Sequence, residues 1–397
     1  MIEINDKSKC CGCTACINVC PQKCIKMVED EEGFKYPQVD KSKCTNCGLC
    51  ERICPVLNTK INEENINQSY CIRSKEKDIL LNSTSGGFFT SLANYVLDND
   101  GIVIGVSLEE GIVKHIIVDS NTRNNLEKTR GSKYVQSDLS FIYSSVKEYL
   151  QKGKMVCFSG TPCQVNGLLK FVMKPYDNLI TVDVICHGVS SPKLLEEYIK
   201  YQELKHKRKI KNIIFRNKTY GYHSGTMKVT FDSSKEYYGS ARTDLMLKSF
   251  FSEISSRPSC YNCAFKSDNH PSDFTIFDCW HASDLVEGLK DDDKGYTNLF
   301  VNTSKGIKIF ENISNKYEVY EIDKEKAINL DGIMVRNSAK SHENRSDFYD
   351  EVNKYGLEKA VNKYIPISKK DYLVEKVKGL LYKTKILNII KKILKKG

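Results

Sequence analysis

One cysteine pattern occurs twice near the start of this sequence, and it limits the possible folds more than any other feature. Each copy reads C-x2-C-x2-C-x3-C-P, and the copies end at Pro21 and Pro55. Cysteines three residues apart on a tight loop can present three thiolates to three irons of one cubane cluster, while the fourth cysteine lies beyond that loop's reach. Each fourth cysteine is therefore expected to bind the neighbouring cluster.

The doubled pattern is typical of bacterial two-cluster ferredoxins, so we predict two 4Fe–4S clusters with crossed ligands. The first cluster is assigned to Cys10, Cys13, Cys16 and Cys54. The second cluster is assigned to Cys44, Cys47, Cys50 and Cys20. Zinc knuckles and disulfides are the alternatives, but zinc sites usually consist of paired C-x2-C units without a third cysteine or a trailing proline. We therefore expect residues 1–58 to form a two-cluster ferredoxin-like domain.

The length and composition of the chain exclude several classes of protein. With 397 residues it has room for two or three domains. The opening residues lack the apolar region of a secretion signal, and no apolar run is long enough to span a bilayer. We therefore expect a cytoplasmic protein whose thiols outside the clusters are reduced. The net charge of +10 is not accompanied by a basic–aromatic recognition motif, so we predict no nucleic-acid partner.

Beyond a polar linker at residues 59–68, the sequence alternates apolar runs and helical stretches, as an α/β domain does. Residues 101–120 predict a β-hairpin that turns at Glu109 and Gly111. Two later segments each consist of a short apolar run, a loop and a helical stretch, at residues 154–172 and 179–207. If their strands are parallel neighbours, the loops after them meet at the carboxyl edge of the sheet, where such folds place their sites.

Four cysteines outside the ferredoxin pattern stand in unusual contexts. Two follow the apolar runs just described and two form a C-x2-C turn; they are Cys163, Cys186, Cys260 and Cys263. Four thiolates together suit a third 4Fe–4S cluster. A zinc site and unrelated thiols are alternatives, as is a nucleophilic Cys163 with His187 as its base, since a cysteine that opens a helix has a lowered pKa. The others are expected to be ordinary thiols: Cys11, Cys24, Cys71, Cys157 and Cys279.

A run of small residues precedes the helical stretch at residues 88–97. Backbone N–H groups at a helix start, helped by hydroxyls, suit the phosphates of a nucleotide cofactor. A plain helix cap is the alternative, and no G-x-G-x-x-G indicates a Rossmann dinucleotide site. The segment RGSKY offers cations and an aromatic ring, or is a surface loop. The candidate cofactor residues are Ser83, Thr84, Ser85, Gly86, Gly87, Lys133 and Tyr134.

The end of the chain, residues 346–397, is expected to form a helical basic tail. Residues 372–396 carry apolar side chains at helical spacing, together with eight lysines and one glutamate. Such a helix either docks on its own protein or frays in solvent, or it attaches to an acidic partner or an anionic membrane. In the last case the protein would lie at the inner membrane face.

Six motifs follow one another along the chain: STSGGFF (83–89), RGSKYVQS (130–137), FSGTPCQVNGL (158–168), DVICHGVSSP (183–192), FRNKTYGY (215–222) and CYNC (260–263). This set resembles the coenzyme F420 hydrogenase/dehydrogenase beta-subunit family over about residues 70–310. The resemblance implies FAD and a 4Fe–4S cluster held by the cysteines of GTPC, CHG and C-x2-C. The family stretch D-I-T-x-G-D-x-W-G reads SDFTIFDCWHASD here. It keeps Asp273, Asp278 and Trp280 but has Phe277 and His281 where the family has glycine, which leaves the organic substrate open.

The predicted architecture combines α+β and α/β parts: the ferredoxin-like domain (1–58), an α/β FAD and iron–sulfur domain (70–345) and the helical tail (346–397). The predicted activity is that of an oxidoreductase. A low-potential donor or redox partner protein would supply electrons through the clusters and FAD to a two-electron acceptor, either deazaflavin coenzyme F420 or another organic substrate, with some members of the family associated with polysaccharide biosynthesis. The alternative is a non-catalytic electron-transfer subunit that docks on a partner enzyme. No catalytic residue is assigned.

Overall fold

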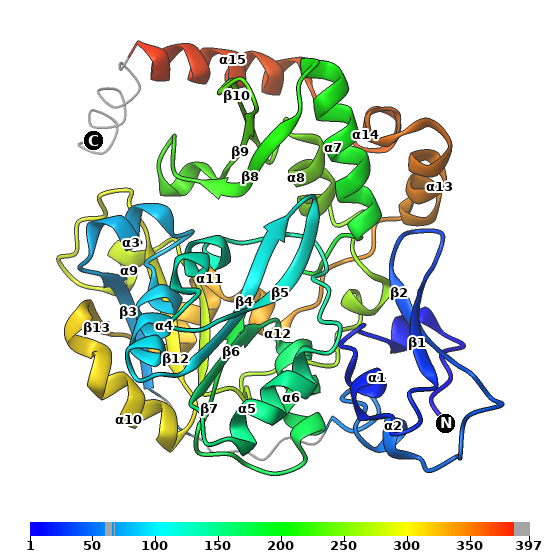
Figure 1. Ribbon diagram of the computed structural model, residues 1–397. Helices are drawn as coiled ribbons and strands as arrows, with labels where there is room; N and C mark the ends of the chain where they lie inside the picture. Colours follow the sequence, from blue (N-terminus) through cyan, green and yellow to red (C-terminus); the bar gives the residue numbers. More distant parts are fainter. Residues whose placement is uncertain (60–65, 67, 385–397) are drawn as a thin grey trace.

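The ferredoxin-like domain consists mostly of loops around one β-hairpin (Figure 1). The computed structural model describes residues 1–59, 66 and 68–384. The helices and strands of this domain are α1 (Ala15–Val19), β1 (Ile25–Glu29), β2 (Lys35–Val39) and α2 (Leu49–Arg52). Helix α1 follows Thr14 and helix α2 follows Gly48, with left-handed φ angles of 64° and 72°. Because these two residues occupy equivalent positions in the two cysteine runs, the sequence repeat is also a repeat of backbone conformation.

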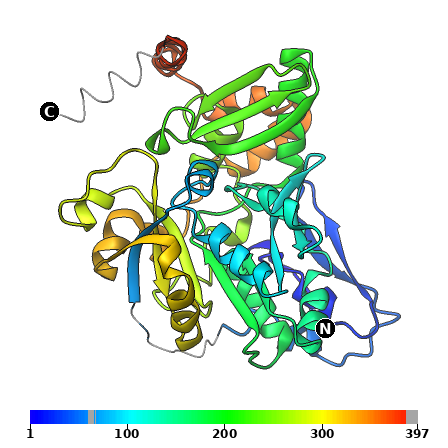
Figure 2. The ribbon, with the colours of Figure 1, turned by 60° about the vertical axis from the view of Figure 1, so that its left-hand side comes forward.

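An eight-stranded mixed sheet organises the larger domain, with strand order β13-β3-β12-β11-β7-β6-β4-β5 (Figures 1 and 2). The pairs β4–β6, β6–β7 and β7–β11 are parallel and the others are antiparallel. The expected hairpin is confirmed as β4 and β5, and the two expected strands are confirmed as the parallel neighbours β6 and β7. The strands are β3 (Gln68–Ser74), β4 (Ile102–Glu109), β5 (Ile112–Val118), β6 (Val156–Gly160), β7 (Leu179–Val184), β11 (Phe274–Cys279), β12 (Tyr296–Val301) and β13 (Tyr317–Glu321).

Helices cover both faces of this sheet because its strands alternate apolar side chains between two cores. On β6, Val156 and Phe158 pack with α5 (Ile142–Gln151) and α6 (Pro162–Val172). The intervening Cys157 belongs to the opposite core, which contains side chains of α4 (Phe88–Asp98) and α10 (Ser304–Ile313). Shorter helices complete this domain: α3 (Lys77–Asn82), α9 (Ala282–Leu285), α11 (Lys324–Asp331) and α12 (Ile333–Arg336).

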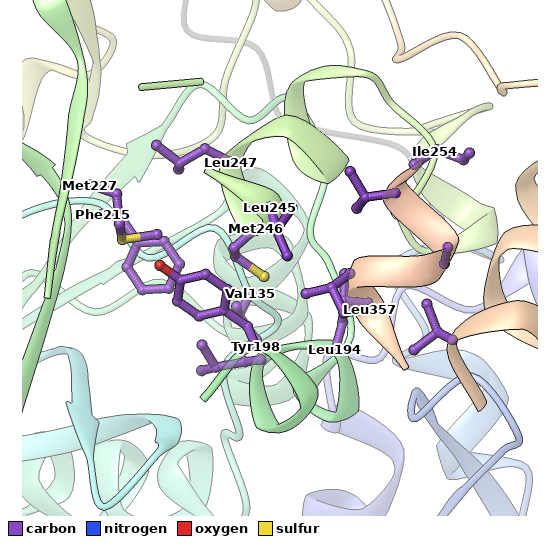
Figure 3. Close-up of a cluster of buried hydrophobic side chains, with 14 of the residues drawn as sticks. Val135, Leu194, Tyr198, Phe215, Met227, Leu245, Met246, Leu247, Ile254 and Leu357 are labelled. Atoms are coloured by element: carbon purple, nitrogen blue, oxygen red, sulfur yellow. The ribbon is translucent and has the colours of Figure 1, made fainter. Parts of the chain in front are cut away.

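A second, three-stranded antiparallel sheet lies beside the large one and has its own helical cover (Figure 2). Its apolar core joins Phe215 and Met227 of the sheet with Tyr198, Met246 and Leu357 of the helices (Figure 3). The elements are α7 (Pro192–His206), β8 (Ile210–Asn217), β9 (Thr226–Phe231), β10 (Glu236–Ser240), α8 (Leu245–Phe251), α13 (Arg345–Tyr355) and α14 (Leu357–Tyr364). The larger domain therefore has two subdomains rather than one.

The tail begins later than expected, and the proposed boundary at residue 346 is wrong. Helices α13 and α14 are part of the core of the second subdomain, where Phe348 and Val361 are fully buried. Helix α15 (Lys369–Lys383) has no buried residue, and its Leu373 and Leu380 are more than 60% exposed. It nevertheless contacts the second subdomain, where Tyr382 packs on Tyr220 and the Thr243 hydroxyl donates to the Glu375 carboxylate at 3.4 Å. The predicted helix at 372–396 continues into residues 385–397, which lie outside the described residues. No helix in the described part of the chain is long and apolar enough to cross a membrane.

The ferredoxin-like domain packs firmly on the rest of the chain. Phe34 and Tyr36 of its hairpin belong to the core of the second subdomain, and Ile53 belongs to the core beneath α5 and α6. Arg345 of α13 donates two hydrogen bonds to the Glu32 carboxylate, at 2.7 and 2.6 Å. Apolar burial and a bidentate ion pair thus fix the first domain against the second.

Candidate functional site

The ferredoxin thiols are grouped in the two crossed sets. One small cavity, which we name the ferredoxin cavity, is lined by Cys20, Cys44, Cys47 and Cys50. The thiol of Cys54 lies beside the other set: after burial, the neighbouring Cys10 and Cys54 are the main causes that raise the pKa of Cys16. Cys13 also neighbours Cys10 and Cys16. The chain therefore brings each fourth cysteine to the opposite run, and iron ligation by these sets stays a prediction.

A fifth thiol lines the ferredoxin cavity. Cys24, expected to be an ordinary thiol, is buried, and its Sγ lies 3.4 Å from the Sγ of Cys20. Burial, and then the adjacent Cys20, raises the pKa of Cys24 to about 11. A thiol that stays protonated can donate to a neighbouring thiolate, so Cys24 is suited to support Cys20.

The other four candidate ligands line a cavity of about 50 Å³ between the two domains, here called the thiol cavity. Cys163 lies in the first turn of α6, whose start is fixed by a capping box between Thr161 and Gln164. Cys186 follows β7, and the parallel pairing of β6 and β7 brings both cysteines to one sheet edge, as expected. The turn after Pro258 supplies the other two. The thiols of this cavity are Cys163, Cys186, Cys260 and Cys263, together with Cys11.

The surroundings of the thiol cavity suit an anionic group. Burial raises the pKa of Cys186 to about 12, so thiolates need compensating positive charge here. Lys266 supplies it: this residue lines the cavity, and its ammonium donates to the carbonyls of Cys186 and Met334, at 2.6 and 2.5 Å. His270 also lines the cavity, and its Nε2 has no hydrogen-bond partner among the described residues. A cluster bound by four thiolates fits this donor set.

Within the described ranges, no three His, Cys, Asp or Glu side chains gather around a point as ligands of a single metal ion would.

The alternative of a nucleophilic cysteine is not favoured by the geometry. Cys163 lines the thiol cavity, with its Sγ 3.1 Å from the Thr161 hydroxyl, whereas His187 lines a different cavity. No hydrogen bond joins the two in the described part of the chain. A hydrogen bond with Cys11, and then burial, raises the pKa of Cys163, and burial lowers the pKa of His187 to about 4. Neither shift prepares a thiolate–imidazolium pair.

A much larger cavity, of about 710 Å³, opens where the two sheets of the second domain meet, and we name it the large cavity. Helix α4 starts at its wall, so the N–H groups of the first turn are available beside it. Of the small-residue run, Ser83, Thr84, Ser85 and Gly87 line the cavity. The hydroxyl of Thr84 accepts a hydrogen bond from the Ser132 N–H at 3.0 Å, which ties this run to the RGSKY segment.

Gly86 differs from its neighbours in the small-residue run, because among the described residues of this run it alone does not line the large cavity. Its N–H donates to the Thr297 hydroxyl at 2.8 Å. A Cβ at this position would lie 2.4 Å from the carbonyl oxygen of Ile72. Gly86 therefore allows the run to pack closely against β3 and β12, and its place among the cofactor residues stays a prediction.

The cation best placed for a phosphate in the large cavity is Arg130 rather than Lys133. Both line the cavity, but the Lys133 ammonium already donates to the carbonyls of Val106, Lys128 and Arg130, at 2.7, 2.9 and 2.9 Å. Burial lowers the pKa of Lys133 to about 7. The Arg130 guanidinium pairs with Asp78 at 3.0 Å, and its buried Nε has no acceptor within the described residues. Lys133 thus stabilises the backbone of the RGSKY segment, while the Arg130 Nε–H can donate to a ligand in the large cavity.

Aromatic side chains line the remainder of the large cavity. Tyr134 lines the cavity and stacks on Phe250 with ring centres 4.4 Å apart, and its contact with a cofactor ring stays a prediction. At another part of the wall, the Arg216 guanidinium lies over Trp280 at 4.5 Å and pairs with Asp278. The cavity therefore combines flat apolar surfaces with hydrogen-bonding groups, a combination that suits a large aromatic cofactor.

The thiol cavity and the large cavity share a wall. Cys186 and Gly188 line both, as do Thr161 and Gln164 at the start of α6. On the opposite side, the Cys11 thiol hydrogen-bonds with Cys13 of the first ferredoxin set and with Cys163 of the thiol cavity. The candidate sites therefore form a continuous series from the ferredoxin-like domain to the large cavity.

Several residues at these sites were not predicted from the sequence, among them Cys11, Arg130 and His270. Cys11 directly follows a cluster cysteine, and Arg130 lies within a motif already singled out, so both had a local signal. His270 had none, because it follows the C-x2-C turn by seven residues and no motif includes it.

Comparison with known proteins agrees with this geometry. Residues 69–142 match the N-terminal part, and residues 153–326 the C-terminal part, of the coenzyme F420 hydrogenase/dehydrogenase beta subunit. This chain belongs to that beta-subunit family. Residues 9–58 match a 4Fe–4S dicluster domain, so the family domain is preceded by an iron–sulfur domain, as the cysteine pattern predicted.

Two curated proteins are similar to this chain in sequence. The coenzyme F420-dependent sulfite reductase of Methanocaldococcus jannaschii is 24% identical over 364 residues, which are 89% of this chain and 53% of that protein. The beta subunit of F420-dependent formate dehydrogenase 1 of Methanococcus maripaludis is 28% identical over 140 residues, 34% of this chain and 35% of that protein. The matched regions thus span about half of the first relative and a third of the second.

A chain of the F420-reducing [NiFe] hydrogenase complex of Methanosarcina barkeri aligns in structure with 78% of this chain and 97% of its own length, at 18% identity and a TM-score of 0.45.

The stretch that departs from the usual beta-subunit pattern adjoins the large cavity. Asp278 and Trp280 line it, whereas Asp273 is buried under the sheet and accepts a hydrogen bond from the Thr181 N–H at 2.8 Å. Phe277 also lines the cavity and packs on Phe300, at 5.1 Å between ring centres. Where the family pattern has glycine, this chain has a ring that lines the cavity and packs in an apolar cluster with Phe300.

Proposed function

We propose that this chain is an iron–sulfur flavoprotein oxidoreductase that carries electrons from a low-potential donor to a two-electron acceptor. The observation that carries the proposal is the continuous series of candidate sites: ferredoxin thiols, Cys11, the thiol cavity and the large cavity. The iron–sulfur clusters supply one-electron transfer, and a flavin supplies the exchange between one-electron and two-electron chemistry.

The residues of the chain have separate tasks in this proposal. The four thiols of the thiol cavity hold the third cluster, and Lys266 compensates its charge. Arg130 and the start of α4 bind the pyrophosphate of FAD, and Tyr134 with Phe250 forms a flat apolar surface for a ring. Cys11 and the shared wall keep successive sites in contact, and close contact is what electron transfer between them requires.

The names of the relatives support coenzyme F420 as the acceptor, since both carry F420 dependence in their description. Phe277 at the cavity wall supports a different organic acceptor equally well. A partner protein as the electron source follows from the second relative, which is described as a subunit.

The composition of the anaerobically purified chain tests this proposal. Three cubanes require ~12 irons per chain, against ~8 if only the ferredoxin-like domain is metallated. We expect the higher count, bound FAD, and dithionite-driven reduction of coenzyme F420. Zinc in place of the third cluster, or a chain without flavin, would contradict the proposal. Full cofactors without reduction of any acceptor would favour a subunit that only transfers electrons to a partner enzyme.

The Arg130 assignment has its own test in two matched variants. Arg130→Gln removes the cation at the large cavity, whereas Arg123→Gln removes a surface arginine that pairs with Asp98 and lies outside the cavity lining. A hydrogen bond to a charged group contributes about 1.5–3 kcal/mol, so FAD affinity should fall about tenfold or more in the first variant only. Equal FAD affinity in the two variants would remove Arg130 from the site.

A further inference from the structure

A buried histidine–aspartate pair lies against the thiol cavity. The His270 Nδ1 is 2.7 Å from a carboxylate oxygen of Asp183, and the side chains are 3% and 0% exposed. Asp183 is the fifth residue of β7, and His270 lies in the loop that enters β11. The pair is therefore held between two neighbouring parallel strands, at the edge that also carries Cys186.

The second ring nitrogen of His270 is the informative atom. It is buried, without a hydrogen-bond partner among the described residues, and the side chain lines the thiol cavity. A buried polar group left unpaired is destabilising, so such an atom marks a missing partner. The same cavity is lined by Cys11 and by the four candidate ligands, so a group bound there would adjoin the His270 ring.

The protonation of the His270–Asp183 pair determines whether the His270 Nε2 can act as a hydrogen-bond donor. Burial alone would lower the pKa of His270, but the charge of Asp183 and its hydrogen bond outweigh burial and raise that pKa. With Nδ1–H donating to Asp183, protonation of the ring places a second N–H at Nε2, which lies beside the thiol cavity. Other charges face the same space: Lys266 is a second cation, and the thiols become anions when they bind iron.

We propose that the Nε2–H of His270 donates a hydrogen bond to a sulfur atom of the cluster held by Cys163, Cys186, Cys260 and Cys263, and that Asp183 positions the ring for it. The inference rests on the proposed third cluster. A donor and a positive charge beside a cluster stabilise the reduced state, which carries one more negative charge, so His270 raises the reduction potential of the third cluster. Asp183 is the positioning residue of this pair. His270 sets the potential at which the third cluster passes electrons toward the large cavity.

The test is a redox titration of the full chain followed by electron paramagnetic resonance. The signal absent from a Cys186→Ser variant identifies the third cluster. In His270→Leu, the ratio of reduced to oxidised third cluster at a fixed solution potential should fall at least tenfold, which is about 59 mV for one electron. His270→Gln keeps an N–H donor and should recover part of the shift. Asp183→Asn keeps the His270 ring, and the reduction potential of its third cluster should shift in the same direction as in His270→Leu.

His115→Leu is the matched control. This histidine is also buried, has one ring nitrogen without a partner in the described chain, and lies outside both cavity linings. It should leave the potential unchanged. An unshifted third-cluster potential in both His270→Leu and Asp183→Asn overturns the inference while the proposed function stands. If His270→Leu loses the third cluster, the reduction potential of that cluster in Asp183→Asn tests the inference instead. A wild-type chain with only two cluster signals overturns both the inference and the proposed function on which it rests.

Discussion

At the scale of single residues, burial decides which polar side chains are available for a ligand. Lys133 and Arg130 are three positions apart in one motif, yet all three donors of Lys133 are committed to backbone carbonyls and Arg130 retains an unpaired Nε among the described residues. Asp244 shows the same principle in the second subdomain. Its carboxylate caps α8 through the Leu247 N–H and accepts from the hydroxyls of Tyr198 and Tyr237.

Asp244 predicts a pH dependence of stability. Burial raises its pKa to about 6, above the value of about 4 expected in the unfolded chain. Between these two values the folded state binds more protons than the unfolded state, so this group makes the free energy of unfolding decrease as pH rises from about 4 to 6. At 1.36 kcal/mol per unit, the full decrease is about 3 kcal/mol.

Asp244→Asn should remove that slope. We expect anaerobic urea midpoints of the wild type to fall relative to those of the variant between about pH 4 and 6, while the difference levels off above about pH 7. The comparison of the two proteins cancels the other titrating groups. Parallel curves over the whole range would show that the Asp244 carboxyl does not titrate in this window.

At the scale of elements, the ferredoxin-like domain is defined by two loop–helix repeats rather than by extensive secondary structure. Thr14 and Gly48 turn the two cysteine runs in the same left-handed way, and each run contributes its fourth cysteine to the other. The repeats differ at one functional point. Cys24 adds a fifth thiol to the ferredoxin cavity, and the first set gains Cys11 as a neighbour instead.

Cys20 and Cys24 give a test of the crossed assignment. Cys20→Ala should damage the second cluster and leave the first intact. Because the Cys24 thiol lies 3.4 Å from that of Cys20, it can take over part of the role, and only Cys20→Ala with Cys24→Ala should lose the cluster fully. Iron should then fall by ~4 per chain, with loss of one paramagnetic signal. Cys24→Ala alone is the control and should retain all iron. Selective loss of the first cluster would reject the crossed assignment.

At the scale of the whole molecule, Arg257 joins the two domains next to the candidate clusters. It is fully buried, and its guanidinium donates to the carbonyls of Cys10 and Lys35 and to the Gln136 side chain, at 2.7, 3.0 and 2.8 Å. It also lies 4.1 Å from the ring centre of Tyr36. One side chain thus ties a ferredoxin cysteine loop and hairpin to the segment that carries Cys260.

Arg257→Met should loosen the docking of the ferredoxin-like domain. Three buried acceptors lose their donor, at roughly 1–3 kcal/mol each. We expect amide hydrogen exchange in β2 to increase at least tenfold, with little change in α4 and β4. Arg257→Lys keeps the charge but not the planar three-way contact, so its amide exchange in β2 should lie between that of the wild type and that of Arg257→Met. Arg336→Gln, which removes a more exposed arginine paired with Asp268, is the control and should leave β2 unchanged. Equal exchange in β2 of all three variants would show that Arg257 does not hold the domains together.

Sequence alone determined those features that depend on local spacing. The cysteine runs predicted the iron–sulfur domain, the alternation of apolar residues predicted the β4–β5 hairpin and the β6–α6 and β7–α7 units, and the ordered motifs predicted the family. These signals are local because loop reach and side-chain periodicity act over a few residues.

Only the tertiary structure decided which residues share a cavity and which helices belong to the core. It brought Cys11 to Cys163, placed His270 at the thiol cavity, committed Lys133 to backbone carbonyls, and packed α13 and α14 into the core of the second subdomain, with α14 against α7 and α8, instead of leaving them in a tail. No local pattern specifies these arrangements, because they depend mainly on contacts between residues far apart in the chain. Whether a polar group is free to bind is fixed by the desolvation and the partners that folding imposes, and these arise only when distant segments meet.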